Sequence, residues 1–396
     1  MRSYDTVVVG LGAMGSAAIY QLAKRGNRVL GIDQYAPPHI NGSSHGETRI
    51  TRQAIGEGEA YTPLALRSHE IWRDLEARTG QSLLTVTGGL IISPAVGRNI
   101  VHGKADFLQQ TIDSANKYQI AHELLNGQQI RERFPQFLTK DDDHGYFEIG
   151  AGFLRPERCV KVQLDLAEAQ GAEIRTSEKV HLVIKDGDGV RIVTDDAEYF
   201  ADKAIIAAGP WINEFLGPAY QGVFKVFRQT LFWFAVNRGE EFSPERFPIF
   251  IWDLGKGNDM YGFPSVDNGM SIKIATEKYT DPTTPEFVDR IVTPDEANDM
   301  YSLRVGPYIG GVTSNCVDSI TCLYTVTPDS NFVIDSLPDT PQIIAASPCS
   351  GHGFKHSAAI GEILAQLVVD GKSSLDISSF SISRMLNGRE SNGTEA

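Results

Sequence analysis

Basic clusters and long apolar runs are both missing from this 396-residue sequence, which carries a net charge of −14 at pH 7. An acidic chain without a run of lysines or arginines is a poor partner for nucleic acids and for anionic membranes. No apolar run is long enough to span a bilayer. Residues 1–10 do not combine a charged region with a long apolar region, so no signal peptide is expected. The sequence therefore predicts a cytoplasmic protein that binds neither nucleic acid nor membrane.

Cysteines are also scarce, and no internal repeat or low-complexity segment is visible. The four cysteines are Cys159, Cys316, Cys322 and Cys349. They form neither a C-x-x-C pair nor a zinc-binding spacing, and large cytosolic proteins seldom use disulfides, so no metal site and no disulfide framework are predicted. A chain of this length buries a large core, and we expect two domains in a monomer or a small homo-oligomer.

What the sequence does have, at its beginning, is the pattern of a dinucleotide-binding unit. Residues 7–9 and 29–32 predict two buried strands, and residues 16–24 have the apolar spacing of a helix. Between the first strand and the helix stand three glycines in the spacing G-x-G-x-x-G: Gly10, Gly12 and Gly15. In this motif the first glycine makes the turn, the second lets the backbone approach a pyrophosphate, and the third lets helix and strand pack closely.

The same stretch indicates how a dinucleotide would be held. The helix N-terminus offers free N–H groups and the positive end of the helix dipole to the phosphates. Asp33 ends the second strand, where a carboxylate accepts a hydrogen bond from a ribose hydroxyl. A bare G-x-G-x-x-G also occurs in ordinary turns, but the strand before it, the helix after it and the acid at the right distance favour a dinucleotide. The stretch suits NAD and FAD equally.

The rest of the chain alternates between segments that would extend the nucleotide-binding domain and aromatic-rich segments. Further helices are predicted at residues 63–78, 107–118, 156–170 and 357–369. Strands that would extend the nucleotide-binding sheet are predicted at residues 172–175, 179–184, 190–193, 199–201, 203–208, 331–335 and 342–346. Aromatic-rich strands, which we interpret as an antiparallel sheet that roofs a ligand site, are predicted at residues 231–235, 250–252, 260–263 and 270–274.

We therefore predict an α/β fold with two interleaved domains. The first is a Rossmann-type domain made of residues 1–88, 148–218 and 328–386. The second, which is built on the antiparallel sheet and is expected to bind the substrate, is made of residues 89–147 and 219–327. Residues 387–396 are expected to form a polar tail.

The segment before the last predicted helix has the features of an anion site. Gly351 and Gly353 let backbone N–H groups point at an anion, and the negative charge of a reduced flavin around N1 and O2 suits such a helix end. By itself this segment is equally consistent with a simple loop leading into a helix. Lys355 adds a cation that can hold a substrate carboxylate, although most lysines are solvated at the surface.

A loop rich in proline, glycine and serine follows Asp33, and three basic residues lie in it or just after it: His45, Arg49 and Arg52. Arg49 and Arg52 are three residues apart, so in a helix they would share a face, where Arg52 could bind a carboxylate bidentately. An exposed arginine in a salt bridge is the alternative. Lys273 lies between two isoleucines in a predicted strand, and the alternation points it either to solvent or to the cofactor.

Cys322 lies in a β-prone run and admits two interpretations. An isolated cysteine is most often a small buried apolar residue. A thiolate next to a flavin could instead add to the 8α carbon of the ring.

Several longer motifs make the chain resemble one known family. They are Pro37-Pro-His-x-Asn-Gly-Ser43, His45-Gly-x-Thr-Arg-Ile-x-Arg52, Gly56-Glu-Gly58, Tyr261-Gly-Phe-Pro-Ser265, Cys322-x-Tyr-Thr325 and Ser350-Gly-His-Gly-Phe-Lys355. Together with the N-terminal glycine motif, they resemble the monomeric sarcosine oxidase and N-methyltryptophan oxidase family of flavoproteins over nearly the whole chain. The resemblance implies that the Rossmann-type domain binds FAD, which would be joined to Cys322 by an 8α-S-cysteinyl thioether.

The resemblance also implies a reaction on a carboxylate-bearing secondary amine. An N-methyl amino acid would transfer a hydride to flavin N5, the imine would be hydrolysed, and O2 would be reduced to H2O2. The implied catalytic residues are Lys273, His45 and Arg49, and the implied substrate-binding residues are Arg52, Lys355, Tyr261 and Tyr324. Lys273 would activate oxygen, while Arg52 and Lys355 would hold the substrate carboxylate. The implied contacts of FAD are Gly10, Gly12, Gly15, Asp33, Ser43, Arg49, Cys322, Gly351, Gly353, Phe354 and Lys355.

The chain departs from the family around the substrate rather than around the flavin. Glu277 stands where sarcosine oxidase has a histidine, and Ile251 stands where it has a methionine. Ser347-Pro-Cys349 also differs from the usual residues before Ser350. Two alternatives therefore stay open: an FAD-dependent dehydrogenase or oxidase of a related imino acid or Amadori-type amine, and a nucleotide-binding protein without catalytic activity.

Overall fold

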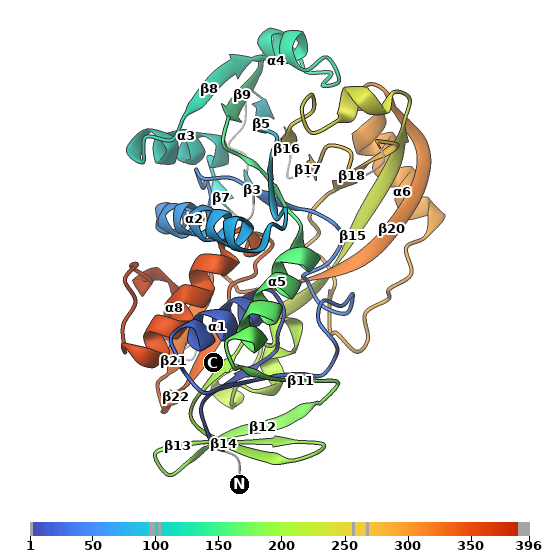
Figure 1. Ribbon diagram of the computed structural model, residues 1–396. Coiled ribbons are helices and arrows are strands. Elements are labelled where there is room, and N and C mark those ends of the chain that lie inside the picture. The colour runs from blue at the N-terminus through green and yellow to red at the C-terminus, as the bar shows by residue number, and fades with distance from the viewer. Residues whose placement is uncertain (1–2, 95–99, 102–103, 256–257, 267–268, 387–396) are drawn as a thin grey trace, which may run out of the picture.

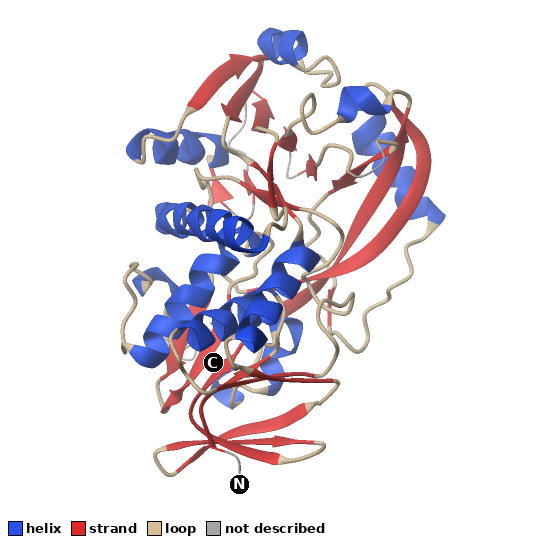
Figure 2. Cartoon of the chain, viewed as in Figure 1, coloured by secondary structure: helices blue, strands red, loops and turns tan. Residues whose placement is uncertain are grey.

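The computed structural model describes residues 3–94, 100–101, 104–255, 258–266 and 269–386, so the predicted polar tail lies outside the described residues. Two large sheets with helices packed against them make up the structure (Figure 2). Within the described residues, no helix has both the length and the apolar character needed to cross a membrane.

The first sheet has eight strands and contains the predicted βαβ unit. Its strands are β1 (Ser3–Val9), β2 (Val29–Asp33), β11 (Glu173–Thr176), β12 (Val180–Asp186), β13 (Gly189–Thr194), β14 (Glu198–Ile206), β21 (Val333–Leu337) and β22 (Thr340–Ser347). The pairs that link β11, β2, β1, β14 and β22 are parallel, and the outer pairs are antiparallel. Residues 7–9 and 204–206 are buried, as expected of parallel strands covered on both faces. The strands predicted at residues 199–201 and 203–208 merge into the single strand β14.

Three helices cover one face of this sheet: α1 (Ala13–Lys24), α5 (Pro156–Ala169) and α8 (Ser357–Val369). Figure 1 shows α1 beside α5 and α8, although the three are far apart in the sequence. The approach of α8 to α1 is close, because a Cβ at Gly361 would lie 2.4 Å from the Cβ of Ala17. Helix α2 (Thr62–Thr79) packs on α8. Helix α1 begins three residues earlier than predicted, since Gly15 already belongs to its first turn.

The second sheet has nine strands: β5 (Gly89–Pro94), β8 (His122–Asn126), β9 (Asp143–Glu148), β15 (Lys225–Val236), β16 (Ile249–Gly255), β17 (Asn258–Gly262), β18 (Ser271–Ala275), β19 (Pro282–Thr283) and β20 (Val312–Val326). All pairs are antiparallel except β5 with β16. The four predicted aromatic-rich strands are therefore confirmed. One face packs into an aromatic core with Phe234 and Trp252, and the opposite face carries Ile251, Tyr261 and Lys273.

A small third sheet corrects one expectation about the arginines. Strand β3 (Arg49–Thr51) pairs with β10 (Gly152–Leu154), which pairs with β4 (Leu84–Val86). The helix that would put Arg49 and Arg52 on one face is therefore wrong. In an extended chain, residues three apart point to opposite sides. Arg49 accordingly reaches Cys322, whereas Arg52 reaches Glu57.

Further elements are α3 (Phe107–Lys117), α4 (Gly127–Arg133), α6 (Pro294–Met300), α7 (Gly306–Tyr308), β6 (Ile100–Val101) and β7 (Lys104–Ala105). Helix α3 packs against β5 of the second sheet. A 3-10 helix, Gly209–Glu214, follows β14, and another 3-10 turn, Phe354–His356, leads into α8.

Candidate functional site

The glycine motif forms a tight cradle at the start of α1. Gly10 has φ of +86°, and a Cβ there would lie 2.6 Å from the carbonyl oxygen of Ala207, so a side chain does not fit. A Cβ at Gly15 would lie 1.8 Å from the carbonyl oxygen of Gly10, which explains the close packing of helix on strand. Gly12 is the N-cap of α1 and brings no side chain to cover the first N–H groups. The cradle leaves room for a phosphate at a helix N-terminus.

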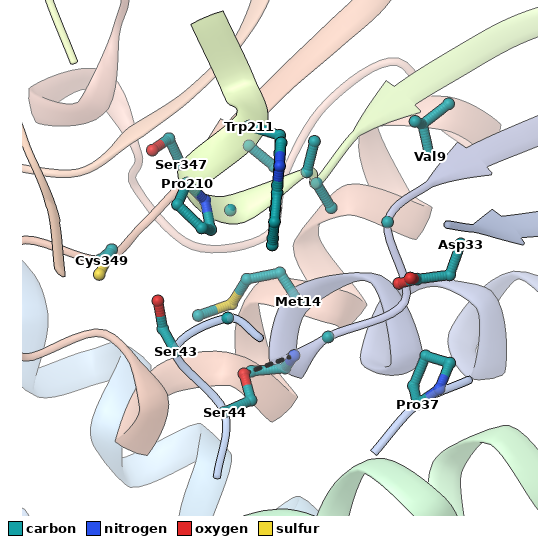
Figure 3. A pocket seen from close by; sticks show the side chains of 18 of the residues that line it. Val9, Met14, Asp33, Pro37, Ser43, Ser44, Pro210, Trp211, Ser347 and Cys349 are labelled. Carbon is teal, nitrogen blue, oxygen red and sulfur yellow. Dashed lines mark hydrogen bonds between the residues drawn. The ribbon is translucent and has the colours of Figure 1, made fainter. Parts of the chain in front are cut away.

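A cavity of about 1260 Å³ opens at this cradle (Figure 3). Ser44 closes one side, where its Oγ accepts a hydrogen bond of 3.2 Å from the backbone N–H of Ala13. Asp33 lies at the end of β2, as predicted, and its two oxygens accept hydrogen bonds of 2.8 Å from the backbone N–H groups of Leu11 and Tyr35. These bonds fix the Asp33 carboxylate at the wall of the cavity, where a ribose would be recognised.

The C-terminal part of the chain supplies another wall of this cavity. Gly351, Gly353 and Phe354 line it. A Cβ at Gly353 would lie 1.7 Å from the carbonyl oxygen of Pro348, so this turn requires glycine. The Oγ of Ser347 lines the same cavity, is buried and has no partner among the described residues. A buried hydroxyl without a partner is expected to bond a ligand, and this cavity therefore fits a large polar group such as FAD.

Cys322 is fully buried on β20, beside the cation of Arg49. The Nη2 of Arg49 lies 3.4 Å from the Cys322 Sγ and 2.8 Å from the carbonyl oxygen of Ser43. The Ser43 hydroxyl donates a hydrogen bond of 2.5 Å to the carbonyl oxygen of Leu323. Tyr324, two residues after Cys322 on the same strand, lines both the cavity at the glycine cradle and a second cavity. These contacts hold the loop that follows Asp33 against β20, next to the Cys322 thiol.

The second cavity, which we call the substrate cavity, adjoins the first and encloses about 670 Å³. Residues that line both cavities are Arg49, Tyr324, Gly351 and Phe354. Its charged lining residues are Arg49, Arg52, Glu57, Asp259, Lys273, Glu277 and Lys355. The structure thus brings together the predicted residues Arg52, Lys273, Lys355, Tyr261 and Tyr324. The hydroxyls of Tyr261 and Tyr324 lie 3.2 Å apart.

Glu57 joins Arg52 and Lys355 into one buried cluster. Its carboxylate accepts a hydrogen bond of 2.5 Å from Arg52 Nη2 and one of 3.3 Å from Lys355 Nζ. The three side chains are at most 6% exposed. Burial lowers the pKa of Lys355 to about 8, even though Glu57 opposes this shift. One carboxylate between two cations leaves a positive charge, and the Nε of Arg52 has no partner among the described residues, so the cluster can bind an anion.

The sequence predicts no role for Glu57, which lies in the motif Gly56-Glu-Gly58. An acid five residues after an arginine carries no regular spacing signal, because the segment from Arg52 to Glu57 is irregular and reaches its geometry through tertiary contacts. Glu148 provides one such contact, accepting hydrogen bonds from the backbone N–H groups of Gln53 and Ala54.

Lys273 points into the protein, which settles the direction that alternation left open. Its Nζ donates hydrogen bonds of 2.7 Å and 2.6 Å to the carbonyl oxygens of Gly46 and Thr48, and it lies 4.1 Å from the centre of the Phe263 ring. Burial, together with Arg49, lowers the pKa of Lys273 well below its ordinary value.

His45 is buried near Arg49 and is uncharged at neutral pH. Burial and the charge of Arg49 lower the pKa of His45 to about 3. Both ring nitrogens are buried without a partner among the described residues. The basic character expected of this pair therefore comes from Arg49, and His45 offers a neutral donor and acceptor.

Two acids line the substrate cavity, and one of them, Glu277, is a departure from the pattern that the chain resembles. Glu277 accepts a hydrogen bond of 2.7 Å from the hydroxyl of Tyr279. Asp259 accepts one of 2.8 Å from Thr276. Ile251 lines the cavity beside them. Besides the cationic cluster, the substrate cavity therefore has acidic and aliphatic lining residues.

A dinucleotide cradle that opens into a buried cavity with cationic and aromatic walls defines an oxidoreductase of the nucleotide-binding α/β class. The model of the family described as FAD dependent oxidoreductase matches residues 5–367. The chain belongs to this family of FAD-dependent oxidoreductases, and it acts as an enzyme on amines. The fold and the FAD cofactor predicted from the sequence are thus confirmed.

Two kinds of relatives agree with this assignment. The chain is 36% identical to monomeric sarcosine oxidase of Bacillus sp. (strain B-0618), over 96% of each chain. It is 34% identical to N-methyl-L-tryptophan oxidase of Escherichia coli O157:H7, over 96% of this chain and 99% of the relative. Among solved structures, NikD, described as an unusual amino acid oxidase essential for nikkomycin biosynthesis, has a TM-score of 0.82 at 24% identity over 96% of this chain and 98% of its own. Glycine oxidase from Geobacillus kaustophilus has a TM-score of 0.77 at 19% identity, covering 97% and 99%. The two structures support the fold.

Proposed function

We propose that this protein is a flavoprotein oxidase of secondary, N-methylated amino acids. In the proposed reaction, an N-methyl amino acid, O2 and water yield the demethylated amino acid, formaldehyde and H2O2. The observation that carries the proposal is the buried cluster of Arg52, Glu57 and Lys355 beside the FAD cavity. The cluster carries an excess positive charge and lines the substrate cavity, which adjoins the FAD cavity. This arrangement favours a substrate that has a carboxylate next to the reacting amine.

The cluster would bind and orient the substrate carboxylate. Arg52 has one buried N–H without a partner among the described residues, and Lys355 is mostly charged at pH 7 because its pKa is about 8. Glu57 holds both cations in place and lowers the cost of burying them. Tyr261 and Tyr324 face the same cavity and would exclude water from the amine. Fixing the carboxylate in this way sets the position of the N-methyl group relative to FAD.

Bound FAD would accept the two electrons of the amine and pass them to O2. Lys273 would serve the oxygen step. Its Nζ is held by two carbonyl oxygens in a buried site, so a positive charge there would stabilise negative charge that develops on oxygen without reorganisation of solvent. Arg49 and the neutral His45 would contact the flavin on the side of β20.

We also propose that FAD is attached covalently to Cys322. The support is the position of the buried thiol, 3.4 Å from the Arg49 guanidinium, on the strand whose Tyr324 lines the FAD cavity. The expected linkage is an 8α-S-cysteinyl thioether. Acid precipitation of the purified protein tests it: the pellet stays yellow if the flavin is attached and turns colourless if it is not.

A peroxide assay over a panel of amines tests the proposed activity. The panel holds sarcosine, N-methyl-L-tryptophan, other N-alkyl amino acids, L-proline, glycine and a fructosyl amine. We expect peroxide from at least one N-methyl amino acid and little from the matched primary amino acid. Peroxide from the imino acid or the fructosyl amine alone would favour the alternative substrate, and reduction of a quinone dye without peroxide would favour a dehydrogenase.

A cytoplasmic location and a monomeric or small oligomeric state belong to the same proposal. All four cysteines are unpaired, which agrees with a reducing compartment. Cell fractionation and size-exclusion chromatography test the two statements separately.

A further inference from the structure

A third cavity lies between helix α3 and the second sheet, next to the substrate cavity. Its empty volume, part of which is open to solvent, is about 1170 Å³. Helix α3 forms one wall with Phe107, Leu108 and Ile112, and strands β5, β8, β9 and β16 form the other. Ile251 lines both this cavity and the substrate cavity. The Phe107 ring, 5.0 Å from the guanidinium carbon of Arg52, also lies between the two. An aliphatic and an aromatic side chain thus separate the third cavity from the cationic cluster.

The strand register places polar side chains on the sheet wall of this cavity: Asp253 on β16, Ser93 on β5 and His144 on β9, the last two directly paired. Asp259 on β17 pairs directly with Asp253 but lines the substrate cavity. One step nearer to the substrate cavity, the corresponding row is formed by Tyr261, Ile251, Ile91 and Tyr146. Residues two apart in a strand are separated by roughly 7 Å. The polar side chains therefore lie about that far beyond Ile251.

Asp253 has a buried carboxylate, one oxygen of which accepts no hydrogen bond from the described residues. Its side chain is 6% exposed, its Oδ1 accepts a hydrogen bond of 2.7 Å from the backbone N–H of Gly255, and its Oδ2 has no partner among the described residues. Burial raises the pKa of Asp253. A cation bound at Asp253 would relieve the cost of burying its charge.

The third cavity also has the opposite electrostatic character to the cationic cluster. Asp106 and Asp253 line it, and its described lining residues include no lysine or arginine. A molecule that extends from Arg52 and Lys355 past Ile251 would therefore meet positive charge at one end, an apolar middle and negative charge at the other end.

We propose that the third cavity binds the distal cationic group of the substrate, so that the preferred substrates are N-methyl amino acids whose side chain ends in an amine or a guanidine. This inference rests on the proposed function and names its substrate class. The carboxylate binds at Arg52 and Lys355, the alkyl chain passes Ile251, and the distal ammonium donates a hydrogen bond to Asp253. Amino acids with apolar side chains gain nothing from Asp253.

Matched probes that cannot be oxidised as secondary amines test the inference. The FAD-loaded protein is titrated with the ω-amino carboxylates from 4-aminobutanoate to 8-aminooctanoate and with the unsubstituted carboxylates of equal chain length, and binding is measured by calorimetry. At one chain length we expect the amine to bind about 10- to 100-fold more tightly, the range for a hydrogen bond to a charged group. Equal affinities of the two probes at every length would overturn the inference.

Two variants test whether Asp253 is responsible for tighter binding of the amine probes. Asp253→Asn keeps the shape of the side chain and is expected to bring the ratio of the two affinities close to one. Asp318→Asn, an exposed acid on β20, is the matched control and should keep the ratio. Retention of the full amine advantage in Asp253→Asn would refute the assignment. If this variant does not fold, equal affinities of the two probes in the wild type would still overturn the inference.

The result is separable from the proposed function. If the protein oxidises no secondary amino acid, the proposed function fails, while the ratio of probe affinities is still measured. If it oxidises N-methyl amino acids but kcat/KM for α-N-methyl-L-lysine does not exceed that for N-methyl-L-norleucine, and the probes bind equally, the function stands and this inference falls.

Discussion

Glu57 sets the charge of Lys355, and its replacement by glutamine should move the pH dependence of substrate binding. In the wild-type protein, KM for a carboxylate substrate is expected to rise as the pH passes about 8, because Lys355 loses its charge there. Glu57 raises the pKa of Lys355, whereas burial and Arg52 lower it. In Glu57→Gln the rise in KM should therefore begin at lower pH.

The contact distance gives the size of this shift. Lys355 Nζ and Glu57 Oε1 are 3.3 Å apart. At an effective dielectric constant of about 20, two unit charges at this separation interact by about 5 kcal/mol, which corresponds to more than three pKa units. Arg52 shares the carboxylate, so the measured shift will be smaller, and we expect a displacement of about one pH unit or more. The variant also leaves two buried cations without their partner, which costs about 3–5 kcal/mol of stability.

The assay is KM for the best N-methyl amino acid between pH 6 and pH 10, with thermal unfolding measured on the same samples. Glu59→Gln is the control, since Glu59 is exposed and pairs with the exposed Lys117, and it should change neither quantity. An unchanged KM profile in a folded Glu57→Gln protein would refute the reasoning that links Glu57 to Lys355 and to the substrate.

Three further predictions concern the neighbouring residues. Arg52→Met should raise KM for carboxylate substrates, with a loss of about 1.5–3 kcal/mol, and steady-state kinetics that match the wild type would contradict it. Lys273→Met should slow reoxidation by O2 by about 10²- to 10³-fold in stopped-flow measurements and slow anaerobic flavin reduction far less; equal slowing of both steps would remove its oxygen role. Cys322→Ser should bind FAD without covalent attachment, so that the intact protein lacks the added mass of FAD, and retention of that mass would place the linkage elsewhere.

The fold was predictable wherever local signals agree with tertiary structure. The segment from β1 to Asp33 is determined by a buried β-branched run, by the close contacts at Gly10 and Gly15 and by the acid at the strand end, and all of these are local features. The aromatic-rich strands were predictable for the same reason, through alternation. Arg49 and Arg52 would share a face only in a helix, and pairing with β10 makes residues 49–51 extended, a long-range contact that their spacing does not reveal.

Residues of the site were predictable only where they belong to a recognisable sequence motif. Lys273 illustrates the limit: alternation gives two directions, and the fold chooses the buried one because Gly46 and Thr48 offer carbonyl oxygens there. Glu57 and Asp253 could not be assigned roles from the sequence, since each depends on which strand or loop becomes its neighbour. Their importance follows from burial and charge, which arise from long-range packing.

The central claim is that a carboxylate-bearing secondary amine reduces FAD in this protein and that O2 then reoxidises it. The most direct measurement mixes the FAD-loaded protein anaerobically with sarcosine, N-methyl-L-tryptophan and α-N-methyl-L-lysine in turn, follows the flavin absorbance, and then admits O2. The account predicts bleaching by at least one of these amines and, after oxygen is added, recovery of the absorbance with one H2O2 formed per flavin. Absence of bleaching with all of them, or recovery with a quinone but not with O2, would contradict it.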